Sequence, residues 1–439
     1  MCLVSTAPPS NAIRVGMLGF GTVGTGAYRM LKENSAAITR KVGRSLELAK
    51  IGIRDPKKPR ILPAGMFTTD LDSIIEDPTI DVVLELIGGV DPAGRLIESA
   101  IRSGKHVVTA NKELIAKNGA RLLKMAHERG LDLHYEAAVG GGIPLVQPLK
   151  HQLAGNDVLK MMGILNGTTN YILTKMRDEG MDFEVALREA QAKGYAEADP
   201  SSDVDGHDAA YKIAILASIA FGKQVPIEQV YREGIRNVSK EDIQYADVLG
   251  YRIKLLGIVE PFAENRILIR VHPTMIPKDH PLAGVNDVYN AVWIHGDFAG
   301  DLMFSGRGAG SHPTASAIVG DLIDVGRTIA KGAEGSVIVY EPGMETEPIE
   351  SLTTSYYVRL IVLDRPKVLG TIATAFGEYA VGLAAMEMRV IDTEQNLGEI
   401  AFLTHPCREG DFRSALVDIE RIGIVKRIAG WIRVERSDP

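Results

Sequence analysis

The chain has 439 residues, of which 45% are hydrophobic and 24% charged, and its formal net charge is −7. A chain of this length exceeds one ordinary core, so we expect a soluble globular protein of several domains. The mildly acidic balance argues against a nucleic-acid-binding surface, for which a basic patch would be expected.

The N-terminal segment 1–11 has neither a positively charged start nor a long apolar core, so it does not indicate a secretory signal peptide. The longest apolar run, 213–221, is shorter than the ~18 residues that span a bilayer. We therefore expect a cytoplasmic protein without a membrane partner.

A glycine-rich turn follows the first predicted strand, Ile13–Leu18, and a helical stretch then continues to Lys32. Glycines at this spacing allow a tight turn, close approach of the backbone to a pyrophosphate, and close packing of helix on strand. The start of the helix offers free N–H groups to phosphates. This context favours a dinucleotide site over a simple tight turn, at Gly19, Phe20, Gly21, Thr22, Val23 and Gly24.

The end of the second predicted strand, 46–53, bears on the choice of cofactor. In NAD sites an acidic residue here bonds the 2′-hydroxyl of the ribose. This chain has Arg54 instead, which suits a 2′-phosphate and favours NADP, whereas Asp55 keeps NAD possible. The alternative is a solvated basic loop that continues through Lys57, Lys58 and Arg60.

Further strands alternate with helices up to residue 135. We predict strands at 80–87, 106–109 and 131–135, and helices at 96–102 and 114–129. This alternation predicts an α/β fold with a doubly wound, parallel Rossmann sheet. Ligands of such sheets lie at the carboxyl ends of the strands, where Gly88 and Lys112 fall. Lys112 either reaches the nicotinamide ribose or the substrate, or is a surface lysine.

Residues 136–144 follow the last of these strands and contain three glycines. Glycine adopts backbone conformations that other residues avoid. The segment is either a hinge between domains or a loop whose carbonyls, with Glu136, coordinate a hard cation. The residues alone favour the hinge.

After Pro144 the pattern changes to an α+β region. Strands are predicted at 158–165, 252–259, 266–271, 291–295 and 302–305, and we expect an open, mostly antiparallel sheet. A glycine-rich turn, 306–310, precedes a helix at 313–331 that we expect to return to the nucleotide domain.

Residues 341–354 contain two prolines and four glutamates, and we predict a linker. Beyond it, strands at 356–363, 384–391, 397–404 and 428–434 alternate with helices that end at 379 and 422. This order is a βαββαβ unit of ferredoxin-like type. The predicted domains are therefore 1–140, 141–312 and 355–436.

The stretch 194–212 holds five carboxylates and one lysine in nineteen residues. Charge of this density beside an apolar helix is costly unless it serves a function. In a helix that begins near Val204, Asp208 and Lys212 share a face. Residues of opposite charge at this spacing usually form an exposed ion pair, and that is the alternative interpretation here. Burial by the apolar run 213–221 would instead make Lys212 a proton donor that Asp208 tunes.

Glu197 precedes this helix and is placed to accept hydrogen bonds from a small substrate. His207 we regard as structural, and no two histidines have the spacing of transition-metal ligands. Cys2 and Cys407 lie far apart, so we expect neither a disulfide framework nor thiol catalysis. Direct hydride transfer needs only positioning and one proton donor.

Four motifs together resemble those of the homoserine dehydrogenases. They are Leu-Gly-Phe-Gly-Thr-Val-Gly at 18–24, Thr-Ala-Asn-Lys at 109–112, Asn-Gly-Thr-Thr-Asn at 166–170, and Gly-Tyr-Ala-Glu-Ala-Asp-Pro at 194–200 with Asp208 and Lys212. The motifs occur in the family's order, and the last three are far more specific than the glycine-rich turn. The resemblance covers nearly the whole chain, and the terminal unit resembles an ACT domain.

The resemblance implies NAD(P)H-dependent reduction of L-aspartate 4-semialdehyde to L-homoserine, on the route to threonine, isoleucine and methionine. It implies that Lys212 is the proton donor and Asp208 the accompanying carboxylate. The substrate-binding residues that it implies are Glu197, Tyr195, Gly167, Thr168 and Lys112. The cofactor positions that it implies are Phe20, Thr22, Val23, Arg54, Lys112 and Gly310.

The resemblance also reverses the preference for a hinge, because the family's monovalent-cation loop, with sodium expected, falls on Glu136, Val139, Gly141 and Ile143. It implies a homodimer or higher homo-oligomer through the central sheet, which makes 141–312 the catalytic and dimerisation domain. It further implies feedback by threonine through an ACT regulatory domain at 355–436. The family loop often reads Asp-x-Pro-Gly, whereas residues 364–367 here read Asp-Arg-Pro-Lys, a departure at the effector site.

No aspartokinase-like segment is recognised, so a stand-alone enzyme is expected. Two alternatives remain. One is another NAD(P)-dependent oxidoreductase that acts on an amino-acid aldehyde or alcohol, and the other is a non-catalytic ACT-type amino-acid sensor. A sensor would have no use for Glu197, Asp208 and Lys212 together.

Overall fold

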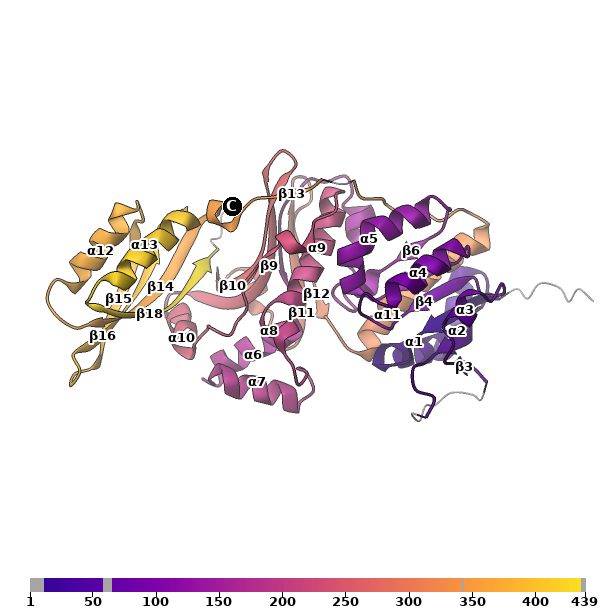
Figure 1. The fold of residues 1–439 in the computed structure, drawn as a ribbon, viewed down its shortest axis with the longest axis horizontal. Helices are drawn as coiled ribbons and strands as arrows, with labels where there is room; N and C mark the ends of the chain where they lie inside the picture. The colour runs from indigo at the N-terminus through magenta and orange to yellow at the C-terminus, as the bar shows by residue number, and fades with distance from the viewer. Residues whose placement is uncertain (1–11, 58–64, 342, 436–439) are drawn as a thin grey trace, which may run out of the picture. The chain divides into compact units, whose positions relative to one another are not determined.

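The computed structural model describes residues 12–57, 65–341 and 343–435, and the chain divides into two compact units (Figure 1). The first unit comprises residues 1–157, 214–227 and 306–344, and the second comprises 158–213, 228–305 and 345–439. The segment 1–11 with Cys2, and also Lys58 and Arg60, lie outside the described residues. Within the described ranges, no helix is both long enough and apolar enough to cross a membrane.

The first unit is built on a parallel sheet of six strands in the order β3-β2-β1-β4-β5-β6. This is the strand order of doubly wound dinucleotide-binding folds. The strands are β1 (Ile13–Leu18), β2 (Leu46–Gly52), β3 (Phe67–Thr68), β4 (Val82–Glu85), β5 (His106–Thr109) and β6 (Leu133–His134).

The helices of this unit are α1 (Thr22–Glu33), α2 (Ser35–Val42), α3 (Asp72–Ile75), α4 (Ala93–Arg102), α5 (Lys112–His127) and α11 (Ser311–Lys331), with the short η1 (Glu136–Ala138) and η2 (Pro148–Gln152). Helix α11 shares the core of β1, although it is remote in sequence. Its residues Ile318 and Leu322 are buried in one cluster with Ile13 and Val15. The apolar face of α11 therefore helps to cover the parallel sheet.

The second unit is built on a mixed sheet with the path β12-β11-β7-β9-β10-β18-β14-β16-β15. Strands β8 and β13 also pair with β10, and β17 pairs with β14. The strands are β7 (Val158–Ile164), β8 (Tyr231–Arg232), β9 (Tyr251–Ala263), β10 (Arg266–Pro277), β11 (Tyr289–Gly296), β12 (Gly300–Arg307), β13 (Glu345–Thr346), β14 (Thr353–Leu363), β15 (Leu383–Asp392), β16 (Leu397–Thr404), β17 (Cys407–Arg408) and β18 (Val425–Val434).

Most of these pairings are antiparallel, as the sequence predicts. The helices are α6 (Gly167–Asp178), α7 (Phe183–Ala192), α8 (Ser201–Val204), α10 (Lys240–Val248), α12 (Val368–Glu378) and α13 (Glu409–Arg421), with η3 (Ile227–Gln229), η4 (Pro281–Gly284) and η5 (Ile349–Ser351). Helix α9 (His207–Phe221) begins in this unit, and its residues from 214 onward belong to the first. The predicted fold class, a Rossmann sheet beside an α+β part, is confirmed.

The terminal module, which we define as residues 353–434, has the predicted βαββαβ order. Its strands lie in the order β18-β14-β16-β15, and Val358, Phe376, Phe402 and Phe412 form its core. The module nevertheless belongs to the larger sheet, because β18 pairs in parallel with β10, Thr274 opposite Arg433.

The predicted linker, residues 341–354, contains the boundary between the two units, after Met344, and its residues from Glu345 onward pack on the second unit. Strand β13 pairs with β10, and Ile349 and Leu352 are buried against Leu268. The apolar residues of this segment decide its structure, since burying them outweighs the turn propensity around them.

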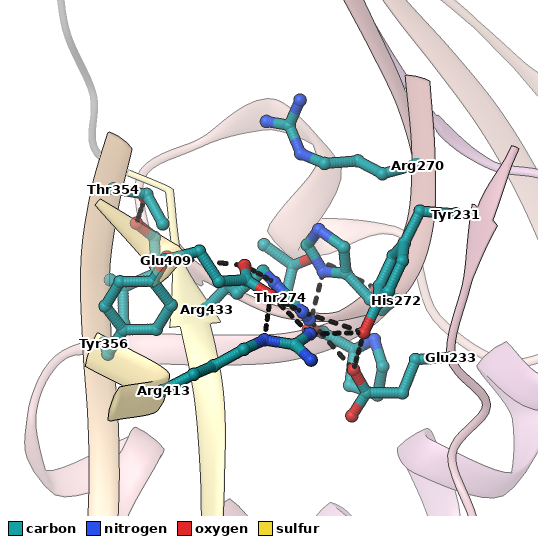
Figure 2. A network of polar contacts seen from close by, with 12 residues as sticks. Tyr231, Glu233, Arg270, His272, Thr274, Thr354, Tyr356, Glu409, Arg413 and Arg433 are labelled. Carbon is teal, nitrogen blue, oxygen red and sulfur yellow. Dashed lines mark hydrogen bonds and ion pairs between the residues drawn. The ribbon is translucent and has the colours of Figure 1, made fainter. Parts of the chain in front are cut away.

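An ion cluster centred on the buried Glu409 and Arg433 joins the terminal module to β8 and the residue that follows it (Figure 2). Arg433 donates to both carboxylate oxygens of Glu409 at 2.6 Å, to Glu233 at 2.9 Å, and to the Tyr231 hydroxyl at 3.0 Å. Arg413 also donates to Glu409 and Tyr231. Glu409 is 0% and Arg433 1% exposed. We call these five residues the Glu409 cluster.

Candidate active site

The glycine-rich turn has the shape that a pyrophosphate site requires. Gly19 has a φ of +99°, and a Cβ there would lie 2.7 Å from the Leu86 carbonyl oxygen. A Cβ on Gly24 would lie 2.8 Å from the Gly19 carbonyl oxygen, whereas one on Gly21 would meet nothing within 4 Å. Gly19 and Gly24 therefore permit close packing, and Gly21 leaves open space at the start of α1, where phosphates bind. These residues fit a dinucleotide cofactor.

A buried carboxylate shapes the carboxyl edge of the parallel sheet. One oxygen of Glu85, at the end of β4, accepts the N–H groups of Ile87 at 2.7 Å and Gly88 at 3.1 Å. The other accepts the Thr109 hydroxyl at 2.6 Å. These bonds fix the loop after β4, which carries Gly88, and the end of β5. The chain after β5 leads to Lys112, the first residue of α5. Sequence reasoning missed Glu85, although a glutamate that ends an apolar strand was the available signal.

Two other predicted cofactor positions, Gly310 and Arg54, lie in the same unit. Gly310, with a φ of +119°, precedes α11, whose Ser311 hydroxyl donates to the Thr22 carbonyl at 2.9 Å. This contact places Gly310 near the glycine-rich turn. Arg54 is exposed just beyond β2, and the Asp55 carboxylate accepts the Lys57 N–H at 2.9 Å.

The predicted acid–base pair lies on α9 in the second unit. The Lys212 ammonium donates to Asp208 Oδ2 at 2.7 Å and to the Leu165 carbonyl at 2.7 Å. The side chains are only 10% and 4% exposed. The pair is therefore not the exposed i,i+4 bridge that this spacing usually means. Helix α9 begins at His207 after Gly206, whose φ is +81°, and not near Val204, which ends α8.

Asn166 organises the polar groups around this pair. Its Nδ2 donates to Asp208 Oδ2 at 2.9 Å and to Asp203 Oδ1 at 2.7 Å. Its Oδ1 accepts the Thr169 N–H at 2.9 Å and so caps α6. We call residues 165–168 the Asn166 turn. Sequence reasoning marked the motif but missed this side chain, because its partners come from the distant stretch 194–212.

Asp203, which sequence reasoning left without a role, is thereby part of the site. Burial raises the pKa of Asp203, and repulsion by Asp208 acts in the same direction, while Asn166 and Thr168 oppose it by hydrogen bonding. Asp205 instead pairs with Arg236 at 2.6 Å on the surface. The charged stretch therefore divides into a buried inner part and a solvated outer part.

Known proteins resemble this chain over nearly all of its length. The family model described as "Homoserine dehydrogenase" matches residues 144–323, and the one described as "Homoserine dehydrogenase, NAD binding domain" matches residues 19–136. A homoserine dehydrogenase from Synechocystis sp. is 46% identical over 433 residues, which cover 96% of this chain and 99% of that protein. The chain belongs to the homoserine dehydrogenase family.

Solved structures of homoserine dehydrogenases also resemble this chain. A homoserine dehydrogenase from Thiobacillus denitrificans superposes with a TM-score of 0.90 at 42% identity, over 97% of this chain and 98% of the other. A hyperthermophilic archaeal homoserine dehydrogenase in complex with NADPH gives a TM-score of 0.62 at 28% identity, over 72% and 97%. The resemblance stated from four motifs is confirmed, and the chain is an NAD(P)-dependent oxidoreductase.

Of the substrate positions implied by the homoserine dehydrogenase motifs, Gly167 and Thr168 lie in the Asn166 turn, and Tyr195 and Glu197 lie in the loop that is bonded to it. The Thr168 hydroxyl donates to the Tyr195 carbonyl at 2.7 Å, which ties the turn to the loop that carries Glu197. Glu197 is exposed, and its carbonyl accepts the Gln191 side chain at 3.0 Å. A Cβ on Gly167 would lie 2.8 Å from the Val288 carbonyl oxygen, so no larger residue fits.

His207 is the first residue of α9. Burial, followed by the positive charge of Arg232, lowers its pKa, so the imidazole is neutral near pH 7. Cys407 is buried, and burial raises the pKa of its thiol to about 11. The environment of Cys407 therefore disfavours the thiolate that nucleophilic work requires.

The predicted cation loop of the homoserine dehydrogenases is densely packed. The Glu136 carboxylate accepts the N–H groups of Leu145, Val146 and Gln147 at 2.6, 2.9 and 2.8 Å. Burial raises the pKa of Glu136, and these N–H groups oppose the shift. The Glu136 carboxylate is already occupied by these three N–H groups. A cation in this loop would therefore be coordinated by backbone carbonyl oxygens, which are suitable ligands for a hard ion. The described residues contain no group of three or more His, Cys, Asp or Glu suited to a metal.

Replacing Asn166 by alanine should lower kcat about 10- to 100-fold, because hydrogen bonds to buried charged groups contribute about 1.5–3 kcal/mol. The loss of the α6 cap should also cost about 1 kcal/mol of stability. Asn166→Ser keeps a capping oxygen and loses both amide donors, so it should lose kcat in the same way and be about 1 kcal/mol more stable than Asn166→Ala. Steady-state kinetics and thermal unfolding of both variants measure this, and wild-type kcat in Asn166→Ala would refute it.

Proposed function

We propose that this enzyme reduces L-aspartate 4-semialdehyde to L-homoserine with NAD(P)H, in the biosynthesis of threonine, isoleucine and methionine. The observation that carries the proposal is the buried Lys212–Asp208 pair on α9, which is hydrogen-bonded to the Asn166 turn, in a chain of the homoserine dehydrogenase family. A non-catalytic sensor would gain nothing from a buried ammonium that faces a carboxylate, because such a pair is costly to desolvate.

The residues of the second unit supply the proton. The nicotinamide, when bound, supplies the hydride for the carbonyl carbon. Lys212 donates a proton to the carbonyl oxygen as that oxygen gains charge, so the aldehyde becomes an alcohol. Asp208 stabilises the ammonium beforehand, and the Leu165 carbonyl fixes its direction. Substrate contacts are proposed for Glu197, Tyr195, Gly167, Thr168 and Lys112.

NADP is the proposed cofactor, since Arg54 stands where an acidic residue would select NAD. Arg54→Ala should raise KM for NADPH about 10- to 100-fold, because one charge-assisted contact to the 2′-phosphate contributes about 1.5–3 kcal/mol. KM for NADH should stay within about twofold. Lys57→Ala is the control for general positive charge. Equal effects of Arg54→Ala on both cofactors would contradict this assignment.

Threonine is the proposed effector, through an ACT-like terminal module. The loop 364–367 ends in Lys367, at the position where the family often has glycine, and Lys367 has a φ of +75°. The lysine thus keeps the left-handed conformation that glycine adopts readily, which supports an effector loop of the family's shape. Initial rates with and without threonine test the proposal. A homodimer or higher homo-oligomer and a cytoplasmic location are proposed from the family alone.

A monovalent cation, with sodium expected, is proposed for the carbonyls of Glu136, Val139, Gly141 and Ile143. Gly140 and Gly141 both have a positive φ, +72° and +58°. Two consecutive residues in this conformation, which glycine adopts readily, turn the backbone sharply, and this supports a loop that folds around one ion. Rates in sodium and in choline chloride of equal ionic strength test this.

The proposed reaction is tested by NADP-linked oxidation of L-homoserine and by the reverse reduction of L-aspartate 4-semialdehyde. Correctly folded protein that is inactive with both cofactors in both directions would reject the proposal. Activity on another amino-acid aldehyde or alcohol alone would favour the broader oxidoreductase alternative.

A further inference from the structure

A buried lysine that the proposed chemistry does not use lies behind the Asn166 turn. Lys254 stands on β9 and is 2% exposed. Its ammonium donates to Asn170 Oδ1 at 3.1 Å, to the Val285 carbonyl, and to Asn286 Oδ1 at 3.3 Å. Three oxygen acceptors therefore meet the three N–H donors of the ammonium.

Burying the Lys254 ammonium costs free energy, because a charged group loses its hydration. Burial lowers the pKa of Lys254 to about 7, the positive charges of Arg177 and Arg252 act in the same direction, and Asp178 and Asp287 oppose them. The groups that the ammonium contacts are neutral amides and carbonyls. Buried charges can often be replaced by apolar side chains without loss of stability. Stability alone therefore does not explain a lysine here.

Asn170 connects Lys254 to the first turn of α6. Its Nδ2 donates to the carbonyls of Val285 at 3.2 Å and Tyr289 at 3.0 Å. Its backbone N–H donates to the Asn166 carbonyl at 3.3 Å. Lys254 and Asn170 thus fasten the start of α6 to the segment 285–289.

The Asn166 turn rests on the same segment. A Cβ on Gly167 would lie 2.8 Å from the Val288 carbonyl oxygen and 3.3 Å from Asn290 Oδ1. The Asn166 turn also binds the acid–base pair. Its Leu165 carbonyl accepts a hydrogen bond from Lys212, and its Asn166 amide donates one to Asp208. A small shift of segment 285–289 therefore reaches the acid–base pair, and misplacement by about 1 Å can cost roughly 100-fold in rate.

We propose that Lys254 is a positioning residue for the reaction. It locks segment 285–289 against α6 and so sets where the Asn166 turn holds the Lys212–Asp208 pair. The inference rests on the proposed function of that pair. A purely structural lysine would change stability and leave kcat unchanged.

The test compares Lys254→Met, Asn170→Ala and the double variant in the full chain. Lys254→Met should lower kcat about 10- to 100-fold and leave KM for NADPH within about twofold. The double variant should be no more than about threefold slower than the slower single variant, because both substitutions break one network. Lys105→Met is the matched control, since Lys105 is 6% exposed and donates to the carbonyls of Asp77 and Ile80 in the first unit. It should lose stability and keep kcat within about threefold.

Amide hydrogen exchange of a peptide spanning residues 165–170 gives a readout that does not need activity. Exchange should be faster in Lys254→Met than in the wild type and in Lys105→Met. Unchanged exchange, additive effects on kcat, or a kcat within threefold of the wild type would each overturn the proposal. An inactive wild type would reject the proposed function instead, and the exchange comparison would still judge Lys254. If Lys254→Met does not fold, Asn170→Ala is judged by the same kcat and exchange criteria.

Discussion

Replacing Lys212 by alanine should lower kcat about 1,000-fold while NADPH binding stays nearly intact. General acid catalysis typically contributes about 10²- to 10⁴-fold, and Lys212 is the proposed proton donor. The side chain is bound by Asp208 and the Leu165 carbonyl, both within the second unit. The glycine-rich turn that fits the pyrophosphate belongs to the first unit. Loss of the proton donor should therefore slow the chemical step and spare the cofactor.

Steady-state turnover of homoserine, together with NADPH binding followed by fluorescence, measures the two properties separately. Lys175→Ala is the matched control, because Lys175 also pairs with a carboxylate four residues away but on the surface, at 21% and 43% exposure. Surface pairs of this kind contribute about 0–1 kcal/mol, so the control should keep both properties. If Lys212→Ala lost turnover and NADPH binding together, Lys212 would be a structural residue and the proton donor would lie elsewhere.

The nucleotide-binding unit was the most predictable part of the chain. Its strands are short apolar runs, and local glycines mark the turn between β1 and α1, so nearly all the information is local. The same holds for Asp208 and Lys212, since a spacing of four on a helix needs no knowledge of distant residues. The side chains of Asn166 and Asp203 escaped prediction because their contacts depend on α6 and α8 meeting in space.

The attachment of the terminal module was the least predictable feature. Its βαββαβ order follows from local patterns, but the pairing of β10 with β18 joins Thr274 to Arg433, which are remote in sequence. The prolines and glutamates of 341–354 predict a linker, but they do not show that Ile349 and Leu352, near its end, are buried against Leu268. Long-range pairing of this kind leaves no periodic signal in the sequence, so only the structure shows that the module continues the sheet.

Replacing Glu409 by alanine should destabilise the second unit by about 3–5 kcal/mol, the usual cost of removing one partner from a buried ion pair. Glu409 is 0% exposed and accepts both Arg433 and Arg413 (Figure 2). Without it, the Arg433 guanidinium would stay buried with Glu233 as its remaining carboxylate. Glu409→Gln keeps the volume and removes the charge, so it separates electrostatics from packing and should lose most of the same stability.

Urea unfolding followed by tryptophan fluorescence measures the stability of the second unit, which holds both Trp293 and Trp431, and the Arg433 guanidinium lies 4.9 Å from the centre of the Trp431 ring. Glu345→Ala is the control, since Glu345 pairs with Arg266 at 3.0 Å on the surface, at 63% and 43% exposure. Its loss should cost at most about 1 kcal/mol. A midpoint in Glu409→Ala equal to that of the control would mean that the cluster adds no net stability, and that β10–β18 pairing and apolar packing alone hold the terminal module to the sheet.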